Sequence, residues 1–232
     1  KPLASIGDRP MLQHVWERAG ASGAARAVIA TDDLRIRDAA AEWGADVLLT
    51  RDDHPSGTDR LAEVVVTRQI APETIVVNLQ GDEPLMPPAL INQVARTLAE
   101  VPDASIATLA APITDSDMLH DPHAVKLITD RSGRALYFSR APIPWDREGR
   151  TDHVLDVARR HLGIYAYRAA FLERYAQLPP SPLEALEQLE QLRALAAGEW
   201  IQVADACMLP GPGIDTQADL LAAEAHFEEN PD

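Results

Sequence analysis

The stretch at residues 75–84 changes abruptly from apolar to acidic. Its first half, Ile75-Val76-Val77-Asn78-Leu79, is uncharged and rich in β-branched residues, which predicts a strand buried on both faces at the centre of a parallel sheet. Gly81 permits a tight turn, after which Asp82 and Glu83 place two carboxylates where the strand ends. Ligands bind at this edge of open α/β sheets. The pattern favours a ligand site, and an acidic surface turn is the competing interpretation.

Composition limits which ligands are expected. The chain has 232 residues, of which 46% are hydrophobic, and a net charge of −15. One large globular domain of this length buries roughly 70–75% of its unfolded surface. The negative charge argues against nucleic acid or an anionic membrane as a partner, because either requires a basic face. A nucleotide held through a metal ion and a few cations remains compatible with it.

Cysteine usage and the ends of the chain bear on its location. Cys207 is the single cysteine, so an internal disulfide cannot form, and no apolar run approaches the roughly 20 residues of a membrane helix. These features predict a cytoplasmic protein. The sequence begins with Lys1 rather than Met and no signal-like stretch follows, from which we expect the natural start to lie upstream.

Helical and strand periods alternate through the first half of the chain, as in β-α-β units. Gly, Pro and N-cap residues separate them. Helices are expected at residues 10–19, 34–43, 88–101 and for about ten residues after the loop 54–60, and strands at 27–30, 47–49, 75–79 and 105–111.

The second half begins with a different pattern. Two strand-like runs at 124–129 and 134–139 read as a hairpin, and a third strand at 161–167 follows a charged segment at 146–160 that we expect to be a mobile loop. We interpret residues 120–168 as an antiparallel insertion within a single domain, 1–232. Helices at 169–178, 183–197 and from about 217, with a strand at 201–204, complete the α/β pattern.

Seven motifs in the same order resemble those of the 3-deoxy-manno-octulosonate (Kdo) cytidylyltransferase, or CMP-Kdo synthetase, family of Gram-negative bacteria. They cover nearly the whole chain, and the 137–145 run is the most discriminating. They are Lys1-Pro2-Leu3, Ser56-Gly57-Thr58-Asp59-Arg60, Gln80-Gly81-Asp82-Glu83-Pro84, Tyr137-Phe138-Ser139-Arg140-Ala141-Pro142-Ile143-Pro144-Trp145, His161-Leu162-Gly163-Ile164-Tyr165, Leu189-Glu190-Gln191-Leu192-Arg193 and Gly213-Ile214-Asp215-Thr216.

The resemblance implies a Rossmann-like nucleotidyltransferase fold, a mixed and mostly parallel sheet flanked by helices, and a homodimer built through the antiparallel insertion. It also implies a reaction: the anomeric hydroxyl of Kdo attacks the α-phosphorus of CTP, giving CMP-Kdo and pyrophosphate for lipopolysaccharide biosynthesis. The family's phosphate-binding loop ends in Gly-Lys-Pro-Leu, of which only Lys1-Pro2-Leu3 is present. The first strand and most triphosphate contacts are therefore expected outside this sequence.

Metal and phosphate ligands follow from the same resemblance. Asp82 and Asp215 are expected to hold Mg²⁺, one ion on the triphosphate and a second near Asp215, the sugar carboxylate and the attacking hydroxyl. Lys1 is expected against the triphosphate, where it would stabilise the leaving pyrophosphate. Asp215 as the N-cap of the final helix, and Lys1 as a solvated terminus, are the competing interpretations.

The remaining site residues form two groups. The nucleotide group, implied to line the cytosine pocket, is Ser56, Gly57 and Arg60; a helix cap with an exposed arginine would also explain it. The sugar group is Gln80, Arg140, His161, Tyr165, Glu190 and Gln191. His161 and Tyr165 lie four apart on one predicted strand and so face one side, although inward packing would explain them equally.

Two other functional classes compete with this hypothesis. One is a different nucleotidyltransferase, which acts on a sialic or other nonulosonic acid, on 8-amino-8-deoxy-Kdo, or on an alcohol of isoprenoid synthesis. The motifs at 137–145 and 161–165 argue against a sialic acid or an isoprenoid alcohol, but they do not separate Kdo from its 8-amino analogue. The other class is a catalytically silent nucleotide-binding dimer.

Overall fold

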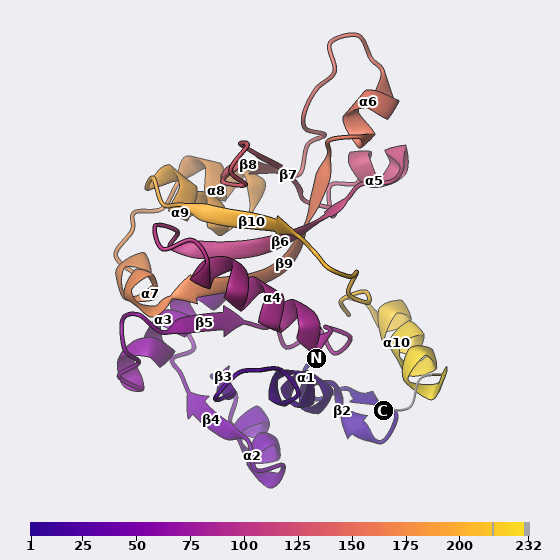
Figure 1. The fold of residues 1–232 in the computed structure, drawn as a ribbon. Coiled ribbons are helices and arrows are strands. Elements are labelled where there is room, and N and C mark those ends of the chain that lie inside the picture. Colours follow the sequence, from indigo (N-terminus) through magenta and orange to yellow (C-terminus); the bar gives the residue numbers. More distant parts are fainter. Residues whose placement is uncertain (215, 230–232) are drawn as a thin grey trace.

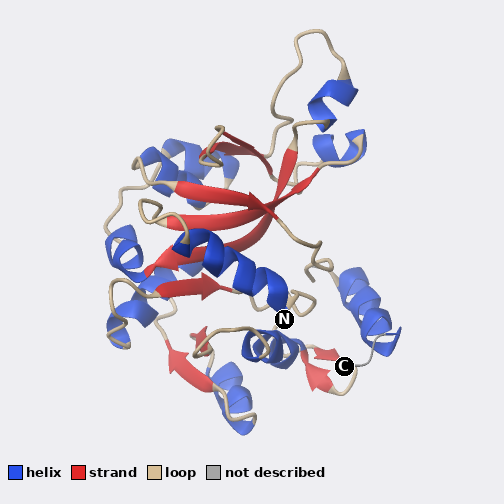
Figure 2. Cartoon of the chain, viewed as in Figure 1, coloured by secondary structure: helices blue, strands red, loops and turns tan. Residues whose placement is uncertain are grey.

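The computed structural model describes residues 1–214 and 216–229 of the chain. Helices flank a mixed six-stranded sheet (Figures 1 and 2), so the predicted α/β class is confirmed. The sheet order is β10-β6-β9-β7-β8, with β5 paired to β9. Its strands are β5 (Ile75–Asn78), β6 (Ile106–Pro112), β7 (Lys126–Thr129), β8 (Ala135–Ser139), β9 (Arg159–Arg168) and β10 (Ile201–Asp205).

β9 takes the central position that we expected for β5. β10 and β6 are parallel, but β9 runs antiparallel to both β5 and β6. The expectation that β5 lies at the centre of a parallel sheet was therefore wrong. The physical reason is that β9 is apolar on both faces: Ile164 and Ala166 pack into one core cluster, and Tyr165 and Tyr167 into another.

Each face of the sheet is covered by a helical layer. α4 (Pro88–Ala99) buries Leu90, Val94 and Leu98 on one face. The opposite face is covered by α3 (Gly57–Thr67), α7 (Ala169–Tyr175) and α9 (Gln191–Ala196). The remaining elements of the N-terminal region are β1 (Ser5–Ile6), β2 (Arg9–Pro10), α1 (Met11–Gly20), α2 (Leu34–Glu42) and the parallel pair β3 (Val28–Thr31) and β4 (Asp46–Leu49).

The single helix expected at 183–197 is two helices. α8 (Pro182–Glu187) ends at Gln188, which adopts a left-handed conformation with φ 53° and ψ 49°, and α9 follows. The Arg140 guanidinium holds this break, because Nε donates to the carbonyl of Glu187 at 2.7 Å and Nη2 to that of Gln188 at 3.4 Å. The break places Glu190 and Gln191 at the start of α9 rather than along a helical face.

The hairpin predicted at 124–139 is confirmed as β7 and β8. Segments before and after the hairpin form an arm that projects from the sheet (Figure 1), with α5 (Ser116–His120) and α6 (Thr151–Leu155) side by side. The segment expected as a loop at 146–160 thus contains a short helix. Asp146 accepts the backbone N–H groups of Glu148 and Arg150, and Val154 joins a small core with Leu119.

The C-terminal helix, α10 (Gln217–Glu229), packs on the N-terminal region. Its Phe227 lies 4.4 Å from the His14 ring of α1, centroid to centroid. The loop before it is held to the acidic turn, since Ile214 N–H donates to the carbonyl of Asp82 at 2.9 Å. Among the described residues, no helix is long and apolar enough to cross a membrane.

Candidate active site

A cleft of about 560 Å³ lies between the N-terminus of α3 and the junction of α8 with α9. It brings together two predicted nucleotide residues, Ser56 and Gly57, and two predicted sugar residues, Gln80 and Glu190. These come from three segments that are far apart in the sequence. Its lining consists of Pro55, Ser56, Gly57, Gln80, Pro180, Ser181, Glu184, Ala185, Gln188, Leu189, Glu190 and Arg193.

The nucleotide wall, residues 55–57, is the start of α3. Ser56 is the N-cap: its Oγ accepts the N–H of Asp59 at 3.2 Å and donates to Asp59 Oδ2 at 2.6 Å. Gly57 then begins the helix, and the first N–H groups of a helix are suited to binding an anion or a carbonyl oxygen. Arg60 lies elsewhere, since its guanidinium pairs with Asp32 at 2.9 Å and donates to the Thr50 hydroxyl. The sequence motif therefore contributes its backbone and serine to the cleft rather than its arginine.

The predicted pair on β9 faces one side, with the rings of His161 and Tyr165 4.9 Å apart. Asn78, two residues before Gln80, is in register with Tyr165, and neither His161 nor Tyr165 lines the cleft. Thr108 Oγ1 donates to the Ile164 carbonyl at 2.7 Å and therefore accepts from His161 Nε2 at 2.9 Å. Burial lowers the pKa of His161 to about 3, so the ring is neutral and its Nδ1 is an acceptor.

Two buried polar atoms on the sugar side have no hydrogen-bond partner within the described part of the chain. They are the hydroxyl of Tyr165 and Nε2 of Gln191. Burial also raises the pKa of Tyr165 well above its usual value, which keeps the hydroxyl a donor. Buried polar groups are nearly always paired in folded proteins.

Arg140 makes three contacts with backbone carbonyls. Nε donates to Glu187, Nη1 to Pro122 at 2.9 Å and Nη2 to Gln188. Glu187 in turn accepts the backbone N–H of Arg140 at 2.9 Å and the hydroxyl of Ser139 at 2.6 Å. In this structure Arg140 braces the turn that carries Glu190, and its predicted contact with a sugar carboxylate stays a prediction.

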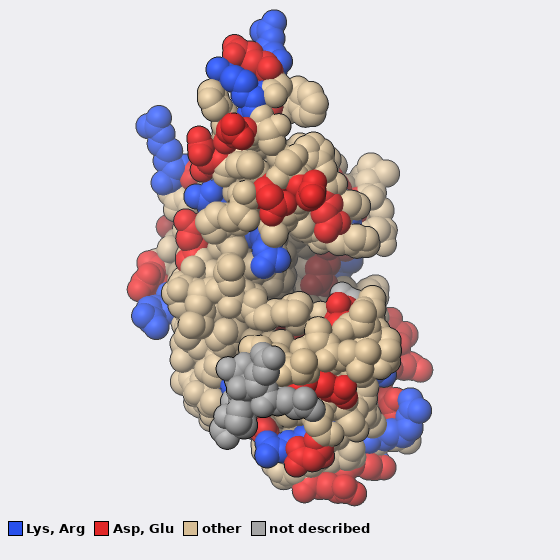
Figure 3. Space-filling view, turned by 90° about the vertical axis from the view of Figure 1, so that its right-hand side faces the viewer, with Lys and Arg blue, Asp and Glu red and all other residues tan. Residues whose placement is uncertain are grey.

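The acidic turn meets the N-terminus at the edge of the sheet. Lys1 Nζ lies 3.0 Å from Asp82 Oδ2, and both side chains are about two-fifths exposed, at 43% and 39%. Figure 3 shows the molecule from the right-hand side of Figure 1, with acidic and basic side chains interspersed on its surface. Asp215 lies outside the described residues, so its predicted metal role stays a prediction. Its neighbour Ile214 is hydrogen-bonded to Asp82.

Asp82 is the predicted Mg²⁺ ligand whose surroundings can be compared with the coordination that this ion requires. Across residues 1–214 and 216–229, no three His, Cys, Asp or Glu side chains cluster as a metal cage. Mg²⁺ is commonly held by one or two carboxylates together with substrate phosphates and water. An exposed carboxylate beside a lysine suits that arrangement, because the phosphates would supply the remaining ligands.

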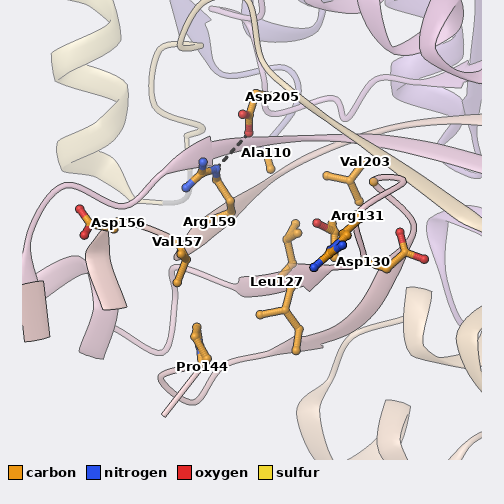
Figure 4. A pocket seen from close by; sticks show the side chains of 13 residues that line it. Ala110, Leu127, Asp130, Arg131, Pro144, Asp156, Val157, Arg159, Val203 and Asp205 are labelled. Carbon is orange, nitrogen blue, oxygen red and sulfur yellow. Dashed lines mark hydrogen bonds and ion pairs between the residues drawn. The ribbon is translucent and has the colours of Figure 1, made fainter. Parts of the chain in front are cut away.

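A second cleft, of about 480 Å³, lies against the β7–β8 hairpin (Figure 4). Its charged side chains include Asp130, Arg131 and Arg159, and Arg159 is paired with Asp205 at 3.1 Å. None of the predicted site residues lines it. The cleft at α3 therefore remains the candidate active site.

Comparison with known proteins shows the family of the chain. The sequence profile described as cytidylyltransferase matches residues 1–201. The 3-deoxy-manno-octulosonate cytidylyltransferase of Halorhodospira halophila is 58% identical over 98% of this chain and 91% of its own length. That of Proteus mirabilis is 53% identical over 98% and 90%. The chain belongs to the Kdo cytidylyltransferase family.

Solved structures place the fold in the same family. The structure of CMP:2-keto-3-deoxy-manno-octonic acid synthetase complexed with CTP matches with a TM-score of 0.91 at 40% identity, over 99% of this chain and 92% of that one. 4-Diphosphocytidyl-2C-methyl-D-erythritol synthase matches with a TM-score of 0.62 at 14% identity, which shows the shared fold alone. The resemblance to Kdo cytidylyltransferases and the nucleotidyltransferase fold are confirmed.

Three polar residues at this candidate site of the Kdo cytidylyltransferase were not singled out from the sequence. Asn78, Asp59 and Arg193 are all at or next to the cleft, and Asn78 and Asp59 are 9% and 7% exposed. Each lies in or beside a motif, but next to a residue with a more obvious role. The usable signal was polarity in an apolar context: Asn78 ends a β-branched run, and Arg193 follows Leu192 on an amphipathic helix.

Proposed function

We propose that this chain transfers the cytidylyl group of CTP to Kdo, giving CMP-Kdo and pyrophosphate. The observation that carries the proposal is the cleft itself, which joins a helix N-terminus bearing Ser56 and Gly57 to a wall bearing Gln80 and Glu190. The relatives named above are Kdo cytidylyltransferases, and the neighbouring synthetase was solved with CTP. The nucleotide would bind at the α3 end and the sugar acid at the α9 end.

The reaction forms one bond and breaks one. The anomeric oxygen of Kdo attacks the α-phosphorus, the bond to the bridging oxygen breaks, pyrophosphate leaves, and the hydroxyl proton passes to solvent. The protein's task is to position both substrates and neutralise charge. Lys1 stabilises charge on the departing pyrophosphate, and the neutral His161 and Tyr165 exchange hydrogen bonds with sugar hydroxyls.

Mg²⁺ is proposed as the cofactor, with Asp82 and Asp215 as the residues that would hold it. When bound, the ion would neutralise phosphate charge and lower the pKa of the attacking hydroxyl. The position of Asp82 beside Lys1 supports this assignment. Arg60 and Arg140 are kept as predicted nucleotide and sugar ligands; each would have to exchange a protein partner for the substrate.

We further propose a homodimer in the cytoplasm. The hairpin and arm expose large apolar side chains, Leu136 at 56%, Trp145 at 80% and Val157 at 57%, and a second copy would cover them. Cys207 is an exposed free thiol, as is common in reducing compartments. CTP and Kdo are the proposed substrates, with no nucleic acid or membrane partner.

The proposal is tested by pyrophosphate release from CTP and Mg²⁺ with a panel of acceptors. We expect turnover with Kdo that exceeds turnover with N-acetylneuraminate or 2-C-methylerythritol 4-phosphate by at least about a hundredfold. 8-Amino-8-deoxy-Kdo is assayed beside Kdo, because the two differ far from the reacting carbon. Preference for a different acceptor would reassign the substrate, and CTP binding without turnover on any acceptor would indicate a silent binding protein.

A further inference from the structure

A network of buried charges connects the two walls of the cleft. Its centre is Arg193 on α9, whose side chain is 11% exposed. The guanidinium lies between Glu184 of α8, with Nη2 at 2.6 Å from Oε1, and Asp59 of α3, with Nη1 at 3.6 Å from Oδ1. Nε also donates to Glu184 Oε2 at 2.9 Å, so that pair is bidentate. The hydrogen bonds to Glu184 are the main reason why the pKa of Arg193 lies above its usual value.

The network reaches the nucleotide wall through Asp59. This carboxylate turns one oxygen toward Arg193 and accepts the Ser56 hydroxyl with the other, at 2.6 Å. The position of the Ser56 side chain in the cleft is therefore set by the same carboxylate that Arg193 attracts. A ligand that engages the hydroxyl or the start of α3 would shift Asp59 relative to the guanidinium.

The network reaches the sugar wall through the carbonyl of Glu190. The backbone N–H of Arg193 donates to this carbonyl at 3.1 Å, and the Tyr175 hydroxyl donates to it at 3.4 Å. The guanidinium carbon of Arg193 lies 4.9 Å from the centre of the Tyr175 ring. A movement of Arg193 would thus displace the segment that carries Glu190 and Gln191.

We propose that Arg193 is a positioning residue through which occupation of the nucleotide wall orders the sugar wall. The inference rests on the proposed function for which substrate each wall binds, and it concerns how the two half-sites communicate. The physical basis is the shape of the side chain. A planar guanidinium can contact two carboxylates and an aromatic ring at once in a single orientation, whereas the ammonium of a lysine could make only some of these three contacts. Binding at one end therefore selects the geometry at the other.

The test uses Arg193→Lys with a matched control, Arg174→Lys. Arg174 on α7 also pairs with one carboxylate, Glu199 at 3.1 Å, and lies over an aromatic ring, Phe171 at 5.9 Å, but outside the cleft. Amide hydrogen exchange of residues 189–193 is measured with and without CTP and Mg²⁺, in the absence of any sugar. We expect CTP to slow exchange about tenfold in the wild type and in Arg174→Lys, and less than twofold in Arg193→Lys.

A second variant guards against a folding defect. Asp59→Asn removes the charge facing Arg193 but leaves the bidentate pair with Glu184, and it should lose the CTP-dependent protection in the same way. Equal protection in all variants, or no protection by CTP in the wild type, would overturn the proposal. The exchange experiment contains no sugar, so its result for Arg193 does not depend on which sugar acid is the substrate. A chain that binds CTP but does not turn over Kdo would refute only the proposed substrate.

Kinetics supply an independent readout. We expect Arg193→Lys to raise the KM for Kdo about tenfold, measured at saturating CTP, while kcat falls by less than about threefold. A purely structural role would instead reduce the concentration of active enzyme and leave KM unchanged. Unchanged KM with reduced kcat would therefore contradict the proposal.

Discussion

At the residue scale, the Lys1–Asp82 pair marks the phosphate end of the site. A carboxylate that already faces a cation at 3.0 Å can exchange that partner for a metal ion while the lysine turns to the phosphates. Both side chains are partly exposed, so their contribution to stability is small. In the proposed reaction these two side chains act through their charge, whereas His161 and Tyr165 are neutral hydrogen-bonding groups.

Asp82→Asn should lower kcat by orders of magnitude and leave the free energy of unfolding within about 1 kcal/mol, because the side chain is an exposed edge residue. Pyrophosphate release and urea denaturation measure the two effects. Asp215→Asn should behave in the same way. Asp38→Asn, which removes an acid paired to Arg37 on the surface, is the control. Activity near that of the wild type in Asp82→Asn would contradict the metal assignment.

His161 should make the protein sensitive to acid. Its pKa is about 3 in the folded chain because burial disfavours the imidazolium, against 6.5 when unfolded. Between these two pKa values the imidazole is protonated in the unfolded chain but neutral in the folded chain. The contribution of His161 to the free energy of unfolding is therefore complete above pH 6.5 and is lost progressively as the pH falls toward 3. The slope is at most about 1.4 kcal/mol per pH unit.

Urea denaturation from pH 7.5 to 4.5 checks this expectation. His161→Gln keeps a donor for Thr108 and removes the titration, so its stability should fall less steeply with pH than that of the wild type. Parallel pH profiles for the two proteins would show that His161 is solvated enough to protonate in place.

Substitution of Arg140 tests whether this side chain binds the sugar carboxylate or only supports the turn between α8 and α9. Arg140→Lys should raise the KM for Kdo more than tenfold, about 1.4 kcal/mol, and leave the KM for CTP nearly unchanged, because the guanidinium holds the turn that carries Glu190. If the side chain acts as a brace, thermal stability falls together with sugar affinity. If it binds the carboxylate, affinity falls alone. Equal losses for both substrates would assign it to the triphosphate.

At the element scale, the site depends on where α8 stops. A continuous helix through 183–197 would turn Glu190 along its face, whereas the left-handed residue Gln188 redirects the chain so that α9 begins at the cleft. Gln188 also donates its side-chain amide to the Ala185 carbonyl at 2.7 Å. The local cost of a left-handed glutamine is offset by these contacts and by Arg140.

In the interior of an ordinary helix, valine is more stable than glycine. At position 188 we expect the reverse order of stability for Gln188→Gly and Gln188→Val. Glycine fits φ 53° without steric cost and should change the free energy of unfolding by less than about 1 kcal/mol, whereas valine should lower it by about 1–3 kcal/mol. Thermal denaturation of both variants measures the difference. Valine proving more stable than glycine would mean that the helix continues through this position.

At the scale of the whole molecule, the arm and hairpin have apolar surface beyond what one chain covers. We expect a symmetric dimer at micromolar concentration by analytical ultracentrifugation. Val157→Asp, at a position 57% exposed in one chain, should shift the equilibrium toward monomer without unfolding it. Val66→Asp, 61% exposed on α3, is the control and should remain dimeric. A wild-type monomer would contradict the proposal.

The sequence by itself determined the class of the chain and the order of its motifs. Helix and strand periods are local properties, so α4, the β7–β8 hairpin and the strand at 75–78 were predictable from residues alone. The ordered motifs identified the family, and the polarity of Ser56, Gln80 and Glu190 marked them as candidates. Even the shared face of His161 and Tyr165 follows from strand geometry.

Only the tertiary structure decided which segments meet. β9 lies between β5 and β6 because both of its faces are apolar. Its partners on these strands are distant in the sequence, so the pairing leaves no local signal. The break at Gln188 depends on Arg140, and the alignment of Ser56 depends on Asp59 facing Arg193 from another helix. Such contacts arise from long-range packing and charge pairing, which local periodicity does not encode.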